Sequence, residues 1–182
     1  METGHDFLRA QINNCIMQHH VLLDAVRTHA EQADDQEYRD LCHRYLPHLQ
    51  QHQAMIEAYG NTIGTVGGGA VKNAFGAVFG KARDVVDSFR ETDFLRVVGD
   101  IVMIRQAQDT FATFATAGDR LGDTKLAELG RMGENDHDEM QADFNAYVAQ
   151  LFVAHVQETV PEKSSRSADT RHESHDAPQM HG

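Results

Sequence analysis

The chain has 182 residues, of which 41% are hydrophobic, and a formal net charge of −12 from 28 acidic and 16 basic side chains. This length predicts one domain that buries a self-sufficient core. The acidic balance argues against nucleic acid and anionic lipid as partners, because both are bound through clustered Lys and Arg side chains that neutralise phosphate.

The ends and the hydropathy of the chain give no sign of a membrane or export segment. No apolar run approaches the ~20 residues that a membrane span needs. The first residues, METGHDFLRA, lack the basic and apolar regions of a signal peptide. Cys15 and Cys42 fall in apolar stripes, where a free cysteine behaves as a small hydrophobe. We therefore expect a cytoplasmic location.

Four segments repeat apolar residues every three or four positions, which predicts amphipathic helices. Strand signals are scarce, so we expect an all-α fold. Thr3 with Asp6, then Asp34, and then Asp123 stand where helix N-caps are expected. The predicted helices span residues 6–31, 35–59, 92–117 and 124–155.

Two stretches differ from these helices in composition. Residues 60–91 begin with a nearly uncharged run rich in Gly, Ala and Val, which predicts a long crossover that contains a short helix over 71–89. Small residues permit close backbone approach, so this crossover is also the expected docking surface for a protein partner or a second copy of the chain. Residues 159–182 carry Pro, Ser and charges but few large apolar side chains, which predicts a disordered tail.

Short turns within each half and one long connection between them predict two antiparallel hairpins joined by a long helical crossover, together a four-helix bundle over residues 1–158. Counting outward from the first turn places His19 and His20 opposite Leu46–His48. Counting from the second places His137 opposite Met103–Arg105.

The predicted helices carry polar residues at inward-facing positions near mid-length, and Gln108 is one of them. Bundles build metal and cofactor sites from side chains that face inward at one level. The candidate metal ligands are His19, His20, His48, His52, Glu134 and His137.

Glu134–Asn135–Asp136–His137 is a Glu-x-x-His motif at mid-helix, the spacing that di-iron carboxylate bundles use. With Gln106–Ala107–Gln108 and Leu121–Gly122–Asp123 before it, this half resembles the second hairpin of small bacterial ferritin-like stress proteins. The resemblance covers residues 6–153. It implies a ferritin-like bundle, iron or another divalent metal as the bound ion, and a role in metal handling or oxidative-stress defence.

The chain also departs from the ferritin-like pattern. Neither His48 nor His52 has a carboxylate three residues before it, and the third segment is aliphatic over Ile101–Ile104, where a ligand is needed. The carboxylates that would bridge two irons are therefore missing. We predict a mononuclear site rather than a complete di-iron centre, and we do not expect catalytic turnover.

Two other interpretations stay open from the sequence. The His48–Leu–Gln–Gln–His52 spacing and the Gln18–His19–His20 run are similar to hemerythrin-like bundles, although the third-helix histidine of that family is missing. Alternatively, the inward histidines only hydrogen-bond to neighbouring side chains. The bundle is then a non-catalytic interaction or assembly module.

Overall fold

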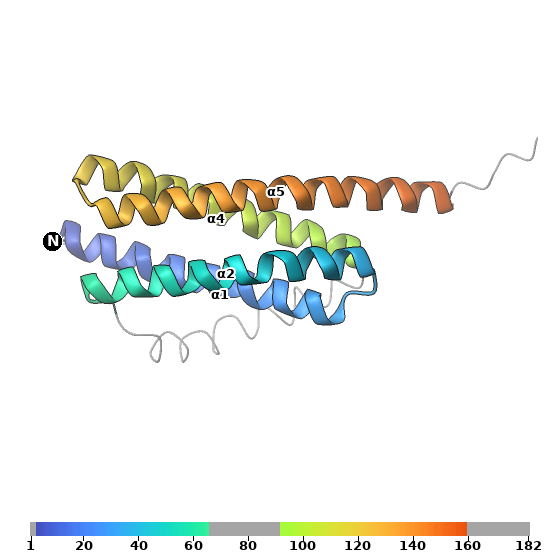
Figure 1. The fold of residues 1–182 in the computed structure, drawn as a ribbon, viewed down its shortest axis with the longest axis horizontal. Helices are drawn as coiled ribbons and strands as arrows, with labels where there is room; N and C mark the ends of the chain where they lie inside the picture. Colours follow the sequence, from blue (N-terminus) through green and yellow to red (C-terminus); the bar gives the residue numbers. More distant parts are fainter. Residues whose placement is uncertain (1–2, 66–91, 160–182) are drawn as a thin grey trace, which may run out of the picture.

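A computed structural model describes residues 3–65 and 92–159 of the chain, and these residues form four helices (Figure 1). They are α1 (Gly4–Gln32), α2 (Gln36–Ile63), α4 (Asp93–Leu121) and α5 (Thr124–Thr159). The described residues contain no strand. The predicted all-α four-helix bundle is thereby confirmed. The predicted crossover helix over 71–89 and the predicted disordered tail lie outside the described residues, apart from Thr159, which ends α5.

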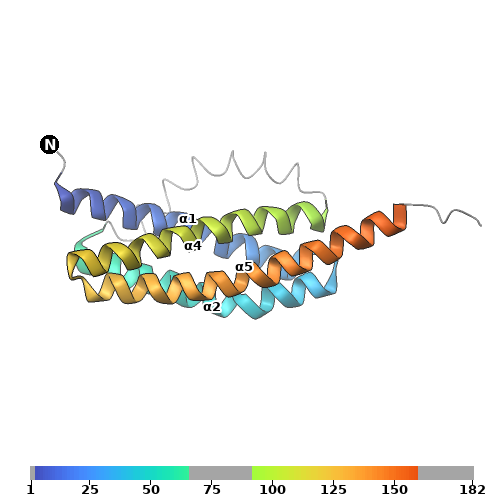
Figure 2. The ribbon, with the colours of Figure 1, turned by 90° about the horizontal axis from the view of Figure 1, so that it is seen from above.

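Each half of the chain forms an antiparallel hairpin, and the two hairpins pack side by side (Figures 1 and 2). α1 contacts α2 and α4, while α5 contacts α4 and α2. The α1–α4 face of the bundle is therefore opposite the α2–α5 face. α2 ends at the end of the bundle where α1 begins, and α4 begins at the other end (Figure 1). The end of α2 and the start of α4 therefore lie at opposite ends of the bundle.

α2 and α4 both end later than predicted, and glycines explain the difference in these two helices. The prediction ended α2 and α4 just before Gly60 and Gly118, but the helices continue to Ile63 and Leu121. Gly60 and Gly118 are helical and buried, whereas the next glycines, Gly64 and Gly122, take positive φ angles of 76° and 71° and end the helices. A left-handed residue at the helix end satisfies the last carbonyl groups, and only glycine adopts that conformation without strain.

Local hydrogen bonds fix the helix starts. Thr3 and Asp6 form the predicted capping box of α1. The α2 cap is Asp35 rather than Asp34, and its carboxylate accepts a hydrogen bond from the Tyr38 backbone N–H. Asp123 caps α5 as predicted, accepting from the Leu126 N–H at 3.0 Å. These caps satisfy backbone N–H groups that have no partner within the helix.

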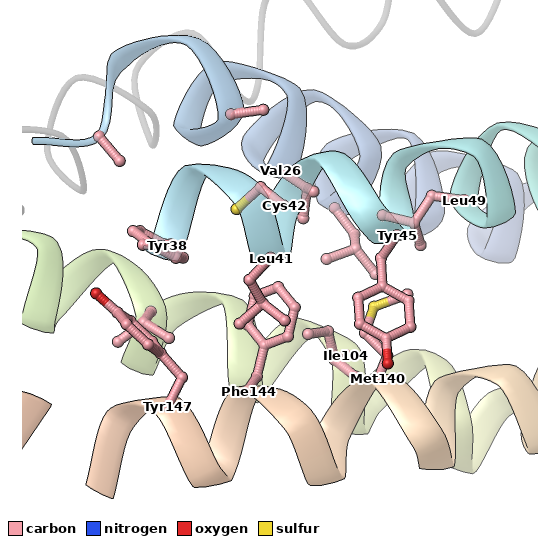
Figure 3. Close-up of a cluster of buried hydrophobic side chains, with 14 of the residues drawn as sticks. Val26, Tyr38, Leu41, Cys42, Tyr45, Leu49, Ile104, Met140, Phe144 and Tyr147 are labelled. Carbon is pink, nitrogen blue, oxygen red and sulfur yellow. The ribbon is translucent and has the colours of Figure 1, made fainter. Parts of the chain in front are cut away.

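The predicted apolar stripes form the core, in two clusters along the bundle axis. In the cluster near the α1–α2 turn, Tyr38, Leu41 and Tyr45 of α2 point toward α5 (Figure 3). Phe144 and Tyr147 of α5 meet them there. The second cluster, built around Ile12, Ile56, Phe111 and Leu126, lies toward the α4–α5 turn. The inward-facing polar side chains predicted from the sequence, His19, His52 and His137 among them, lie between these two apolar clusters.

The last turns of α5 project beyond the other helices (Figures 1 and 2). Phe152, Val153 and Val156 are exposed on this projection. Across the described residues, none of the helices combines the length and the apolar character that crossing a membrane requires.

Candidate metal centre

Three histidine rings from three different helices meet in the bundle interior. His19 comes from α1, His52 from α2 and His137 from α5, and all three side chains are buried. One ring nitrogen from each lies within 4.8 Å of the others. The ring centroids are 5.1 Å apart for His52 and His137, 5.5 Å for His19 and His137, and 6.0 Å for His19 and His52. We call these three residues the histidine triad.

The fourth helix, α4, closes the fourth side of the site with an apolar side chain. Phe111 of α4 lies 5.1 to 5.9 Å from all three imidazole centroids. It fits there because residue 133 of α5 is glycine, and a Cβ at Gly133 would overlap the Phe111 ring. The sequence predicted a hydrophobic wall on this helix at Ile101–Ile104. α4 does present a hydrophobic side chain to the triad, but that side chain is Phe111, about two helical turns beyond Ile104.

Each triad ring has one nitrogen held by a hydrogen-bond acceptor. His19 Nδ1 lies 3.1 Å from Gln53 Oε1, and His52 Nε2 lies 2.9 Å from an Asp136 carboxylate oxygen. His137 Nδ1 lies 2.7 Å from the Gly133 carbonyl oxygen. A carboxylate and a carbonyl only accept, so each of these ring nitrogens carries the proton and donates.

The opposite ring nitrogens therefore carry lone pairs, and they have no partner. His19 Nε2, His52 Nδ1 and His137 Nε2 are buried and make no hydrogen bond to any described residue. Buried polar atoms without partners are uncommon in proteins, and each leaves a desolvation penalty uncompensated. Metal-ligating histidines characteristically donate their second N–H to a carboxylate or carbonyl, which fixes the tautomer and the ring orientation. The triad shows this pattern in all three rings.

Burial keeps the rings neutral. Desolvation, with repulsion from the neighbouring imidazoles, lowers the pKa of His19 from its usual 6.5 to about 3. Desolvation likewise lowers the pKa of His137 to about 4, with a smaller contribution from His52. The pKa of His52 is also lowered by burial, although the Asp136 carboxylate opposes this shift. Neutral imidazole is the form that binds a metal ion.

The other candidate ligands lie outside the triad. His20 is directed to the surface, with Nε2 3.3 Å from Asp24, and His48 is half-exposed, with Nδ1 3.5 Å from Asp136. Glu134 is half-buried and is not one of the converging residues, so the Glu-x-x-His motif contributes only its histidine to the triad. Gln108 donates to Asp138 at the surface. Sequence reasoning also missed the supporting partners Gln53 and Asp136, each directly adjacent to a triad histidine in the sequence.

The heights predicted by counting from the turns were wrong. His19 meets His52 and Gln53 rather than Leu46–His48, and His137 packs against Phe111 rather than Met103–Arg105. The α4–α5 turn is shorter than predicted because α4 continues to Leu121, and helical side chains lean toward the N-terminus of their own helix. In an antiparallel hairpin this lean brings together residues that are not level along the backbone.

A second buried polar cluster, which the sequence did not indicate, lies near the α1–α2 turn. The fully buried Asp100 of α4 accepts from Tyr38 Oη at 2.7 Å and lies 2.9 Å from His29 Nδ1. A fully buried aspartate is rare unless it is paired. Its partners lie on α1 and α2, more than sixty residues earlier in the chain. Local spacing therefore gave no signal of which side chains pair with this aspartate.

Comparison of the chain with protein-family models, with curated proteins and with solved structures finds no match. The chemistry of the triad follows from its donor atoms. Three neutral imidazoles suit borderline divalent ions such as Zn²⁺, Fe²⁺ or Co²⁺. Metal–nitrogen bonds of roughly 2.0–2.1 Å would bring tetrahedrally placed nitrogens to about 3.4 Å from one another. A modest closing of the rings achieves this, so the residues fit a single ion.

Proposed function

We propose that this protein binds one borderline divalent metal ion, iron or a similar ion, through His19, His52 and His137. The convergence of three buried histidine rings carries the proposal, because each ring has one nitrogen held by an acceptor and one buried nitrogen without a partner. An ion would satisfy three buried lone pairs at once. Bound there, it would act as a Lewis acid with part of its coordination sphere left for an exogenous ligand.

The proposed setting is a ferritin-like bundle that serves metal handling or oxidative-stress defence. Two antiparallel hairpins, with the end of α2 and the start of α4 at opposite ends of the bundle, support the ferritin-like assignment. The donor set supports a mononuclear centre rather than the di-iron kind, because none of the residues that converge on the triad is a carboxylate. The Asp136 carboxylate contacts the triad through a hydrogen bond that it accepts from His52.

Metal stoichiometry of the full chain, purified without an affinity tag, tests the proposal. After loading with Co²⁺, Zn²⁺ or anaerobic Fe²⁺ and desalting, elemental analysis should give one ion per chain. His172, His175 and His181 near the C-terminus could retain metal on their own account. A full chain with these three changed to alanine should keep the ion.

Matched substitutions locate the ion. His19→Ala removes a triad nitrogen, whereas His20→Ala removes the adjacent, outward-directed imidazole. We expect His19→Ala to lose the ion and His20→Ala to retain it, with unchanged helical content in both. Substoichiometric metal in the wild-type chain, or equal retention by both variants, would overturn the proposal.

A further inference from the structure

A pocket between α1 and α4 has His19 of the triad in its lining. Its volume is about 270 Å³. Cys15 and Gln18 line it from α1, and Gln106, Ala107 and Thr110 line it from α4. A cavity of about 150 Å³ is large enough to hold a benzene molecule, so this pocket has room for a small molecule beside His19.

The described residues that line this pocket carry no acidic or basic side chain apart from the His19 imidazole. Cys15 stays uncharged, because burial raises the pKa of its thiol to about 12. The pocket therefore offers no built-in anion to a cation bound at the triad. Its polar groups are the neutral amides of Gln18 and Gln106 and the hydroxyl of Thr110.

The acidic side of the site faces the other way. Asp136 contacts His52 and His48 on the α2–α5 face, opposite the α1–α4 face where the pocket opens. Three neutral imidazoles carry no charge to offset the two positive charges of a divalent ion, and the Asp136 carboxylate acts only through its hydrogen bond to His52. An uncompensated buried charge is strongly unfavourable, and a directly bound monovalent anion cancels one of the two positive charges.

We propose that the pocket between α1 and α4 admits a small monovalent anion, such as hydroxide or a linear triatomic anion, to the open coordination position of the triad metal. This inference rests on the proposed metal site and adds its ligand class and its entrance. Amide N–H groups of Gln18 and Gln106 at the pocket provide uncharged donors for such an anion.

Azide titration of the Co²⁺-loaded full chain tests this inference. The visible d–d absorption of Co²⁺ reports its coordination directly, so no enzymatic activity is needed. We expect a saturable spectral change with azide in the wild-type protein. If Co²⁺ binds but azide leaves the spectrum unchanged, the inference fails while the metal site stands. If Co²⁺ does not bind, the proposed function itself fails.

Two variants place the entrance. Ala107→Leu fills the pocket from α4, and Ala112→Leu makes the same change at another half-buried position of that helix, outside the pocket lining. We expect Ala107→Leu to bind Co²⁺ with azide affinity reduced at least tenfold, and Ala112→Leu to match the wild type. Because Ala107 also packs against the core, Gln18→Trp provides a second block from the exposed pocket wall. Wild-type azide affinity in Gln18→Trp would overturn the proposed entrance.

Discussion

Gln53 fixes the tautomer of His19. The Gln53 side-chain amide group donates to the Glu57 carboxylate at 2.7 Å, which turns its carbonyl oxygen toward His19 Nδ1, 3.1 Å away. Because that oxygen only accepts, the His19 proton is on Nδ1 and the lone pair is on Nε2. One glutamine therefore sets which His19 nitrogen carries the lone pair while leaving the imidazole uncharged.

Replacing Gln53 by leucine should weaken metal binding more than it weakens the fold. The change leaves His19 Nδ1–H buried without an acceptor, which costs about 1–3 kcal/mol in the free energy of unfolding. Loss of such a supporting partner typically lowers metal affinity by about 10–100-fold. Competition with a metal indicator measures the affinity, and urea unfolding measures the stability.

The control for this change is Gln50→Leu, on an exposed position of the same helix. It should leave both the metal affinity and the unfolding free energy close to the wild-type values. Equal metal affinity in Gln53→Leu and Gln50→Leu would show that Gln53 does not orient His19.

Acid should destabilise the metal-free protein as the pH falls from 6.5 to about 3. The pKa values of His19 and His137 are lowered to about 3 and about 4 in the folded chain, against a usual value of 6.5. Between these values the unfolded state binds more protons than the folded state, so stability is complete above pH 6.5 and falls as the pH is lowered. At pH 5 each of these two histidines should contribute a loss of about 2 kcal/mol.

Urea unfolding of the metal-free chain at pH 7, 6 and 5 checks this dependence. His137→Leu removes one of the titrating groups, so its unfolding free energy should vary less steeply with pH than that of the wild type. The carboxylates that also titrate near pH 5 are common to both proteins and cancel in the comparison. Identical slopes for the two proteins would contradict the assignment of neutral, buried histidines.

The sequence predicted the fold and the triad histidines because both follow from local periodicity. His19, His52 and His137 each continue an apolar stripe, and a residue within a stripe is buried whatever its polarity. The same periodicity placed Tyr38, Phe111 and the other stripe residues in the core. Helix ends were less predictable, since Gly60 and Gly118 are buried within helices and the chain turns at later glycines.

The arrangement around the triad depended on information that helical spacing does not contain. Asp136 contacts a triad histidine and Glu134 does not. This difference depends on the rotation of α5 about its own axis, which is set by the packing of α5 against α2 and α4. The Asp100 cluster likewise joins three helices, so spacing puts its aspartate on the same face as Val97 and Ile104 but does not identify its partners on α1 and α2. Predicting which residues lie level with one another along the bundle required the lean of each side chain as well as the length of each turn.

Removal of the Asp100 carboxylate should be strongly destabilising. Asp100→Ala would leave Tyr38 Oη and His29 Nδ1 without their shared acceptor, and loss of one partner of a buried ionic cluster typically costs about 3–5 kcal/mol. Asp100→Asn keeps the size and one acceptor oxygen, so it should cost less and remain folded. Chemical denaturation of both variants measures the effect.

Asp109→Ala provides the comparison for Asp100, because Asp109 is an exposed aspartate on the same helix in a surface ion pair with Arg105. Surface pairs contribute little, so this variant should unfold close to the wild type. Folded Asp100→Asn protein should still bind one Co²⁺, since none of the cluster side chains belongs to the triad. Loss of the ion in that variant would indicate that the two polar clusters are coupled.

Substitution of Gly133 by alanine tests whether Phe111 shapes the triad. At an open helix position, glycine to alanine stabilises by about 1 kcal/mol. At Gly133 the new Cβ would overlap the Phe111 ring, and such overpacking typically costs about 1–3 kcal/mol. The displaced ring would press on His19, His52 and His137, so the Co²⁺ spectrum should change along with stability. Gly4→Ala, where nothing lies near the added Cβ, should not be destabilised. A Gly133→Ala protein that is more stable than the wild type, with an unaltered Co²⁺ spectrum, would show that Phe111 does not close the fourth side of the site.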